Sequence, residues 1–195
     1  MRPSLIVADN FYSDPDGIRK TGLKYIESGE QNKFSPSRRL IEKLEGLLGR
    51  KITKGLKNEP ERDNGSFHVQ NYKYEFTLSI HHDLGAYELV GLVYLTPNAP
   101  PNTGTSFWKH RKTGIVSAPT PSDARRLGIS VAELSRILKE DKDKRNKWYE
   151  ITRVGNVYNR LVIFRAGHLH SATAVFGTNN EDSRLTQVFN FSTLL

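Results

Sequence analysis

From residue 66 onward the chain is a succession of short segments rich in β-branched and aromatic residues, and this feature constrains its fold most strongly. Turn-forming residues separate most of them, among them Gly85, the stretch 97–101 and Gly167. Many short, evenly spaced strands are typical of a sandwich or a barrel. We therefore expect strands over 66–70, 74–82, 88–96, 104–109, 149–154, 159–166, 169–176 and 184–192.

The N-terminal third has a mixed pattern. Residues 4–8 suit a short strand, and Asp14-Pro15 is typical of the start of a helix, here extending to about Glu27. Ser35-Pro36 repeats this signature and predicts a second helix that ends at Gly49. Residues 50–65 are polar and predict a loop.

A basic segment interrupts the predicted strands. Residues 109–147 carry 11 basic and 5 acidic side chains, which is +6 of the net charge of +8. Within it, the sequence from Ser130 to Glu133 is typical of a helix start. Such a segment favours an anionic partner, namely nucleic acid, a phosphorylated metabolite or an acidic protein, and it also suits a solvated lysine-rich surface. We expect it to form a lid or a docking surface.

These patterns together predict a mainly β protein with flanking helices (α+β), with a jelly-roll-like barrel at its centre. We expect one domain over 1–195, in which 1–65 supply helical support and 66–195 form the barrel with an insertion at 109–148. The chain has no cysteine, which excludes a disulfide scaffold, an iron–sulfur cluster and a thiol nucleophile. Its apolar runs are too short for a membrane helix, and we expect a cytoplasmic protein.

All six histidines fall in the strand-rich region. Alternation along residues 77–83 puts His81 and Asp83 on one face, above the polar Thr77 and Ser79. Two such side chains can hold a metal ion from one side, with a third ligand from elsewhere in the fold. His168 and His170, which follow a buried-strand pattern, are the nearest candidates.

A further strand places Arg184, Thr186, Val188 and Asn190 on one face. An arginine on the inner face of an apolar barrel is costly unless it meets an anion, and its planar guanidinium suits a carboxylate. An edge arginine paired with Glu181 or Asp182 is the alternative. Two histidines and one carboxylate leave three positions open on an octahedral metal, as in the facial triad of non-haem Fe(II) oxygenases.

The order of these segments resembles the 2-oxoglutarate/Fe(II)-dependent dioxygenase superfamily, on its prolyl-hydroxylase-like branch. The likeness covers roughly residues 66–192, and the segments that carry it are Ile80–Asp83, Gly91–Thr96, Gly104–Trp108, Asn159–Phe164, His170–Ala172 and Arg184–Thr186. The resemblance implies a double-stranded β-helix, a cupin-like barrel. It also implies Fe(II), the cosubstrate 2-oxoglutarate and O₂, with ascorbate as a supporting reductant.

The resemblance also implies roles for individual residues. His81, Asp83 and His170 would hold the iron, with His168 competing with His170. Contacts to 2-oxoglutarate are implied for Arg184, Thr186, Tyr94 and Tyr72. The reaction would hydroxylate a substrate C–H bond, a prolyl or other peptidyl side chain being favoured, with release of succinate and CO₂.

Two other functions stay open. A cupin-like isomerase or hydrolase would use the metal and the barrel but would not need Arg184. A nucleic-acid-directed dioxygenase, or a nucleic-acid-binding module, would use the mixed aromatic and basic residues at the start of the insertion. Trp108, His110 and Arg111 are our candidates for substrate contact there, and core packing is the alternative for Trp108.

Overall fold

The computed structural model describes residues 5–29, 34–56, 64–73 and 78–194. Its helices are α1 (Pro15–Ser28), α2 (Arg38–Leu48), α3 (Pro121–Leu127) and α4 (Val131–Asp141), with short 3₁₀ turns at Pro101–Thr103 and Arg145–Lys147. Its strands are β1 (Leu5–Ala8), β2 (Ile52–Lys54), β3 (Ser66–Gln70), β4 (Leu89–Tyr94), β5 (Thr105–His110), β6 (Trp148–Val154), β7 (Leu161–Arg165), β8 (His170–Ala172) and β9 (Arg184–Thr193).

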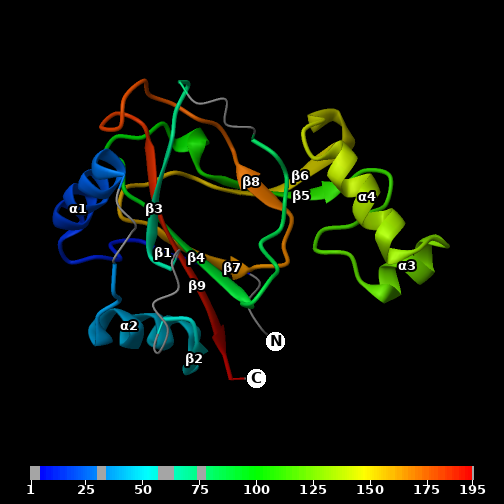
Figure 1. Cartoon of the computed structure of the whole chain (residues 1–195), viewed down its shortest axis with the longest axis horizontal. Helices are drawn as coiled ribbons and strands as arrows, with labels where there is room; N and C mark the ends of the chain where they lie inside the picture. The colour runs from blue at the N-terminus through cyan, green and yellow to red at the C-terminus, as the bar shows by residue number, and fades with distance from the viewer. Residues whose placement is uncertain (1–4, 30–33, 57–63, 74–77, 195) are drawn as a thin grey trace.

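Two antiparallel sheets form the body of the molecule (Figure 1). The larger has the order β1-β7-β4-β9-β2, with β3 also paired to β9, and the smaller has the order β6-β5-β8. A bridge between His81 and His170 adds the segment before β4 to the smaller sheet. From β3 onward the chain therefore crosses back and forth between the two sheets. This is the double-stranded β-helix, the mainly β fold with flanking helices that the sequence predicts.

Alternation along β9 separates the core from the barrel interior. Leu185, Phe189 and Phe191 are buried in the cluster that includes Leu40 and Leu44 of α2. The alternate residues Arg184, Thr186, Val188 and Asn190 line a cavity on the other face. Every second residue of a strand points to the same side, so β9 serves as the wall between the two regions. The predicted common face of these four residues is confirmed.

Most predicted strands are present, with bounds within two residues of those expected, but several details differ. Residues 74–77 of the strand expected at 74–82 lie outside the described residues, and the rest of it forms only an isolated bridge at His81. The strand expected at 169–176 is only three residues long. Helix α2 begins after Ser37, whose side chain accepts a hydrogen bond from Leu40 N at 3.2 Å, and not at Ser35-Pro36. The predicted loop 50–65 contains β2, because Ile52 is buried in the core.

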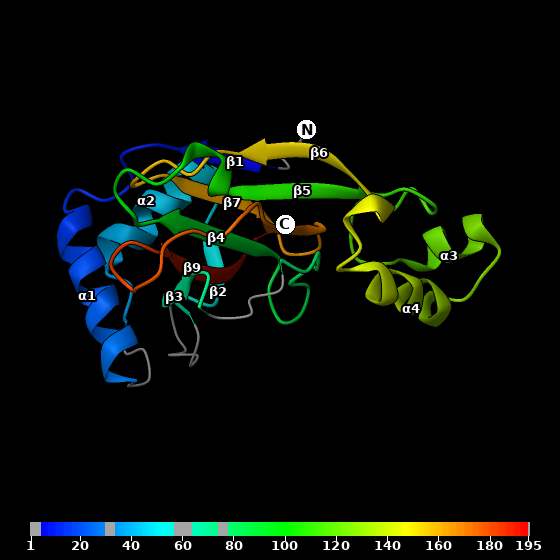
Figure 2. The same ribbon diagram turned by 90° about the horizontal axis from the view of Figure 1, so that it is seen from above.

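The basic insertion has a small core of its own. Leu134 and Leu138 of α4 pack with Trp148, Trp108 and Ile80. Helix α3, which the sequence analysis missed, begins at a capping box formed by Thr120 and Asp123. Figure 2 shows α3 and α4 beyond the ends of β5 and β6, away from the helices that cover the larger sheet. In the described ranges no helix is long and apolar enough to span a membrane.

Candidate metal centre and cosubstrate pocket

Backbone pairing brings His81 and His170 together. The amide of His81 donates to the carbonyl of His170 at 3.0 Å, and the amide of His170 donates to the carbonyl of His81 at 2.8 Å. Residues that exchange both bonds are direct neighbours across an antiparallel pair. Their imidazole centroids lie 4.6 Å apart. Two histidines 89 positions apart in the chain therefore present their rings to one point.

The orientation of both rings is set by the same kind of hydrogen bond. Nδ1 of His81 lies 2.8 Å from the carbonyl of Ser79, and Nδ1 of His170 lies 2.9 Å from the carbonyl of His168. A carbonyl only accepts, so each Nδ1 carries the proton and donates. In the neutral ring this leaves the lone pair on Nε2, which is the arrangement found in metal-ligating histidines.

Asp83 completes the cluster. Its amide donates to the carbonyl of Ala166 at 2.7 Å, which holds the residue beside the two rings. Its carboxylate oxygens lie 3.4 Å from Nε2 of His81 and 3.3 Å from Nε2 of His170. One potential ligand atom from each of the three residues lies within 4.8 Å of the other two. Converging electron pairs from two imidazoles and a carboxylate form a site for a cation.

The protonation states suit metal binding. Burial, with a smaller contribution from the charge of His170, lowers the pKa of His81 below its ordinary value. For Asp83 burial raises the pKa, but the hydrogen bond and charge of His170 and the charges of His81 and His82 outweigh it, so the pKa lies below the usual range. At neutral pH the His81 ring is therefore neutral and the Asp83 carboxylate is ionised, as ligation requires.

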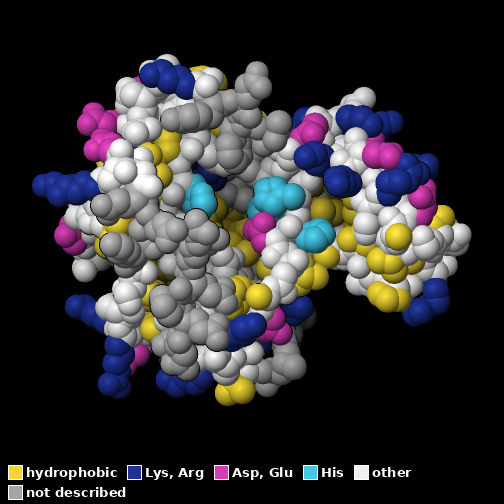
Figure 3. Space-filling view, in the orientation of Figure 1, with side chains coloured by type: hydrophobic (Ala, Val, Ile, Leu, Met, Phe, Trp, Pro, Cys, Tyr) yellow, Lys and Arg dark blue, Asp and Glu magenta, His cyan; other side chains and the backbone are white. Residues whose placement is uncertain are grey.

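The cluster opens into a cavity of about 690 Å³ inside the barrel. Figure 3 shows histidine side chains gathered around a hollow in the middle of this face. Arg184 lines the same cavity and is only 2% exposed. Its guanidinium donates to the carbonyls of Thr103 at 3.0 Å and Gly104 at 3.2 Å and to the side-chain oxygen of Gln70.

All three acceptors of Arg184 are neutral. Among the residues that the structure describes, no carboxylate lies within ion-pair distance of this guanidinium, and the edge position paired with Glu181 or Asp182 is wrong. Burial lowers the pKa of Arg184, but a guanidinium stays charged in proteins. A buried charge without a counter-charge is costly. The cavity therefore combines three potential metal ligands with a buried cation that has no anionic partner among the described residues.

Tyr94 and Thr186 lie beside Arg184. The guanidinium is 5.6 Å from the centroid of the Tyr94 ring, and the hydroxyl of Tyr94 donates to Oγ1 of Thr105 at 2.8 Å. Thr186 is 2% exposed and lines the cavity with Thr105. Strand β4 pairs Tyr94 directly with Thr186 of β9, which explains their proximity.

Tyr94 is fully buried and is not among the residues that line the cavity, and the structure does not bring the remaining predicted residues there either. The side chain of Tyr72 is 69% exposed and lies outside the cavity lining. Trp108 donates to Oγ of Ser171 and packs in the core of the insertion. His110 is fully buried between Thr113 and Asp141, and Arg111 stacks on the Tyr149 ring at 3.6 Å. These side chains stabilise the start of the insertion.

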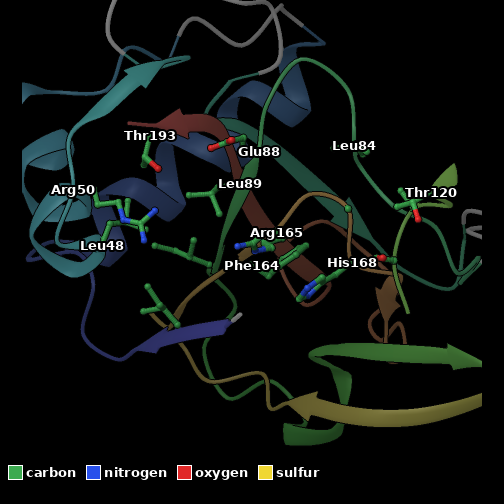
Figure 4. Close-up of a pocket in the computed structure, with 15 residues that line it drawn as sticks. Leu48, Arg50, Leu84, Glu88, Leu89, Thr120, Phe164, Arg165, His168 and Thr193 are labelled. Atoms are coloured by element: carbon green, nitrogen blue, oxygen red, sulfur yellow. The ribbon is translucent and has the colours of Figure 1, made fainter. Parts of the chain in front are cut away.

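His168 lines a second cavity, of about 570 Å³ (Figure 4). The chain turns at Ala166 and Gly167, and His168 then bridges Ser117, whereas His170 bridges His81. The two histidines line different cavities and do not share a face as the sequence suggested. Phe164 lines both cavities, and its ring packs on His170 at 4.6 Å. Of the two competing histidines, the structure therefore brings His170 to the cluster.

Sequence reasoning missed Gln70 and Thr105 as neighbours of Arg184. Gln70 pairs with Arg184 in the register of β3 and β9. Strand alternation within 66–70 could have identified it, because Ser66, His68 and Gln70 share a face and all line the cavity. The carbonyls of Thr103 and Gly104 carry no signal in the sequence.

Comparisons with known proteins give a family without a known activity. A model of DUF6445, described as a family of unknown function, matches residues 79–189. No curated protein matches the sequence.

Solved structures of iron-dependent or hydroxylating enzymes have similar folds. A Pseudomonas putida prolyl-4-hydroxylase is 11% identical with a TM-score of 0.48, and the match covers 97% of this chain and 86% of that one. An N-substituted L-amino acid dioxygenase from Burkholderia ambifaria is 12% identical with a TM-score of 0.49, covering 95% and 80%. HygX from Streptomyces hygroscopicus, with iron bound, is 12% identical with a TM-score of 0.42, covering 98% and 83%. Since all three scores lie below one half, the function of this chain has to be inferred from its own residues.

Proposed function

The chain belongs to DUF6445, a family of unknown function, and we propose that it is an Fe(II)- and 2-oxoglutarate-dependent dioxygenase that hydroxylates a C–H bond. The observation that carries the proposal is the buried, uncompensated Arg184 in the same cavity as the His81, Asp83 and His170 cluster. A dicarboxylate that contacts the metal at one end and the arginine at the other would satisfy both parts of the cavity.

The donor set fits iron. His81 and His170 would each supply Nε2, and Asp83 would supply one carboxylate oxygen. Two histidines and one carboxylate on one side of the ion leave positions open for a bidentate cosubstrate and dioxygen. Bound iron would supply the activation of dioxygen, with 2-oxoglutarate oxidised to succinate and CO₂ and one oxygen atom transferred to the substrate. The carbonyls of Ser79 and His168 keep both rings oriented for that role.

The protein's own contribution is to position the cosubstrate. The Arg184 guanidinium would bind the distal carboxylate by charge-assisted hydrogen bonds, with the hydroxyl of Thr186 beside it and the Tyr94 ring packed near the guanidinium. Burial strengthens this interaction, because Arg184 is only 2% exposed and little solvent reaches it to screen its charge. Apart from Asp83 and Arg184, no described residue that lines the cavity carries a formal charge. A prolyl or other uncharged peptidyl side chain fits such a lining better than a phosphorylated group.

The test is an anaerobic titration with Fe(II) and 2-oxoglutarate, followed by the visible metal-to-ligand charge-transfer band. We expect the band in wild type, its loss in His170→Ala, and a weakened affinity for 2-oxoglutarate in Arg184→Gln. Tyr72→Phe is the matched control, since that side chain lies outside the cavity. A folded, metal-loaded wild type without the band would refute the proposal. Metal-dependent activity unaffected by Arg184→Gln would favour the isomerase or hydrolase instead.

A second candidate function, nucleic-acid binding, is favoured by the outer face of β5 and β6. All five acidic side chains of the insertion pair with basic residues within it. Lys109 lies opposite Tyr149 in the strand pair, and two residues further along the amide of Arg111 donates to the carbonyl of Lys147. None of these three cations has an ion-pair partner among the described residues. Like charges on neighbouring strands are destabilising. A phosphate backbone would neutralise them, with the exposed Arg111–Tyr149 stack as a platform for a base.

Fluorescence anisotropy with a labelled single-stranded oligonucleotide tests this candidate. The double variant Lys109→Gln/Lys147→Gln should weaken binding and reduce the slope of log affinity against log salt by about 0.7 per lost contact. Lys20→Gln/Lys24→Gln on α1 is the matched control. Equal affinity for both double variants would refute the assignment, and tighter binding of polyglutamate would indicate an acidic protein as the partner.

A further inference from the structure

The strand segment that carries His81 lies between β8 and the basic insertion. On one side, His81 pairs with His170 of β8. The other side would be an open sheet edge, with unpaired backbone groups at residues 78–80. The chain that follows α4, residues 142–145, covers that edge. The insertion therefore contacts the metal-ligating segment directly, although its sequence shows no connection with the metal motif.

Each of the three residues before His81 has its own contact with residues 142–145. The carbonyl of Leu78 accepts a hydrogen bond from the Arg145 guanidinium at 3.0 Å. Oγ of Ser79 donates to the Asp143 carboxylate at 2.5 Å. The amide of Ile80 donates to the carbonyl of Lys142 at 3.0 Å. Lys142 is the C-cap of α4, where helix carbonyls lack intrahelical partners, so this last bond satisfies both elements.

Arg145 also reaches the second histidine ligand. Its guanidinium lies 4.4 Å from the Trp108 ring centroid and donates to Oγ of Ser171 at 3.3 Å. Ser171 directly follows His170, and its Oγ also accepts from Nε1 of Trp108 at 3.1 Å. One half-buried side chain thus contacts the backbone three residues before one proposed ligand and the side chain next to the other.

This arrangement determines the direction of the His81 ring. The Ser79 carbonyl holds Nδ1 of His81 at 2.8 Å, so Nε2 points at the metal position only while Ser79 keeps its orientation. Asp143 and Arg145 hold the residues at and next to Ser79. Below them, Ile80 is anchored in the core of the insertion with Leu134 and Leu138.

We propose that residues Lys142–Arg145 form a clasp that holds the metal-ligating segment Leu78–His81 in place, with Arg145 as its positioning residue. The inference rests on the metal site proposed above for its effect on ligation, but not for the clasp itself. It gives the basic insertion a role inside the site, in addition to any docking role of its outer face.

The first experiment measures Co(II) binding by its visible absorption spectrum. Arg145→Gln should weaken Co(II) binding by about 10- to 100-fold, the range found when groups that orient metal ligands are removed. Arg145→Lys keeps the charge but loses the planar stack on Trp108 and the hydrogen bonds to two acceptors. Its Co(II) affinity should lie between those of wild type and Arg145→Gln. Arg136→Gln is the matched control, because Arg136 lies on α4 and pairs with Glu133 and Glu140, away from residues 78–81. It should bind Co(II) within twofold of wild type.

The second experiment measures hydrogen exchange of the metal-free protein. Arg145→Gln should raise exchange at residues 78–81 and leave the amides of β4 unchanged, whether or not the metal proposal is correct. Unchanged exchange at 78–81 would overturn the clasp. Faster exchange with unchanged Co(II) affinity and spectrum would overturn its positioning role. A wild-type protein that fails to bind Co(II), with Arg145-dependent exchange intact, would instead refute the proposed function and leave the clasp standing.

Discussion

The substitution Gly104→Ala adds one methyl group and tests both the packing of β5 against β6 and the proposed cosubstrate pocket. Gly104 precedes β5 with a φ of −79°, so the constraint is steric and does not require a left-handed backbone. A Cβ built there would lie 1.9 Å from the carbonyl oxygen of Val154 and 2.8 Å from the amide nitrogen of Asn156. Both neighbours are backbone atoms at the end of β6 or just after it, so no side-chain rotation relieves the overlap. Gly104→Ala must push β5 and β6 apart at this end.

The displaced carbonyl has two partners. The Gly104 carbonyl accepts from Nη2 of Arg184 at 3.2 Å and from the amide of Thr173 at 3.0 Å. Overpacking of this kind costs about 1–3 kcal/mol, and each weakened hydrogen bond adds about 1 kcal/mol. We therefore expect Gly104→Ala to lower the free energy of unfolding by roughly 3–5 kcal/mol. Its affinity for 2-oxoglutarate should fall as well, because Arg184 loses one of the acceptors that orient it.

Gly46→Ala supplies the control with the opposite sign. Gly46 lies in α2, and a Cβ there meets nothing within 4 Å. Alanine in a helix interior should stabilise the protein by about 0.5–1 kcal/mol. Urea unfolding of wild type and both variants measures these differences. Equal midpoints for Gly104→Ala and wild type would refute the steric argument. A destabilised Gly104→Ala with unchanged 2-oxoglutarate affinity would refute the orienting role of this carbonyl.

Three further outcomes follow from single residues. Ser37→Ala should cost about 1 kcal/mol in urea unfolding because it removes the N-cap of α2, whereas Ser35→Ala should leave the midpoint unchanged. Leu134→Ala, which empties a fully buried position in the insertion, should cost about 2–5 kcal/mol in the same assay, and a cost near zero would show that α4 is not packed. Burial lowers the pKa of His168, so between that pKa and 6.5 the unfolded chain binds more protons than the folded one. The stability of the metal-free protein should therefore fall as the pH drops through 6.5, and His168→Gln should make this fall shallower in unfolding curves at several pH values.

The features of the fold that depend on local periodicity could be predicted from the sequence. The strands follow from alternation and turn-forming residues, and alternation alone places His81 with Asp83 and Arg184 with Thr186. Between His170 and Arg184, which are fourteen positions apart, a hydrogen-bonded loop leads into β9. Asp182 accepts hydrogen bonds from the amides of Thr178 and Asn179, which closes the loop before β9.

Features that depend on tertiary packing were not predictable. Alternation separates the two faces of β5 but does not say what covers each face. It therefore could not predict that His110 is buried and hydrogen-bonded to Asp141. The composition of the insertion indicates a charged segment and does not predict the hydrophobic core around Leu134. The alternation that would have grouped His168 with His170 does not hold after the turn at Ala166 and Gly167, because His168 bridges Ser117 and His170 bridges His81.

For Arg184, the prediction from the sequence and the contacts in the structure can be compared directly. From the sequence, an arginine facing the barrel interior predicts an anion, because no other arrangement offsets its desolvation. That anion could have been a carboxylate of the protein itself, and the two side chains would then have formed a structural ion pair. Instead the described residues give the arginine two carbonyls and an amide oxygen, which hold the guanidinium in place without neutralising it. Full compensation then has to come from a molecule that enters the cavity. A hydrolase that used only a metal-bound water would leave this cost unexplained, whereas a dicarboxylate shared with the metal cluster accounts for the charge, its burial and its position.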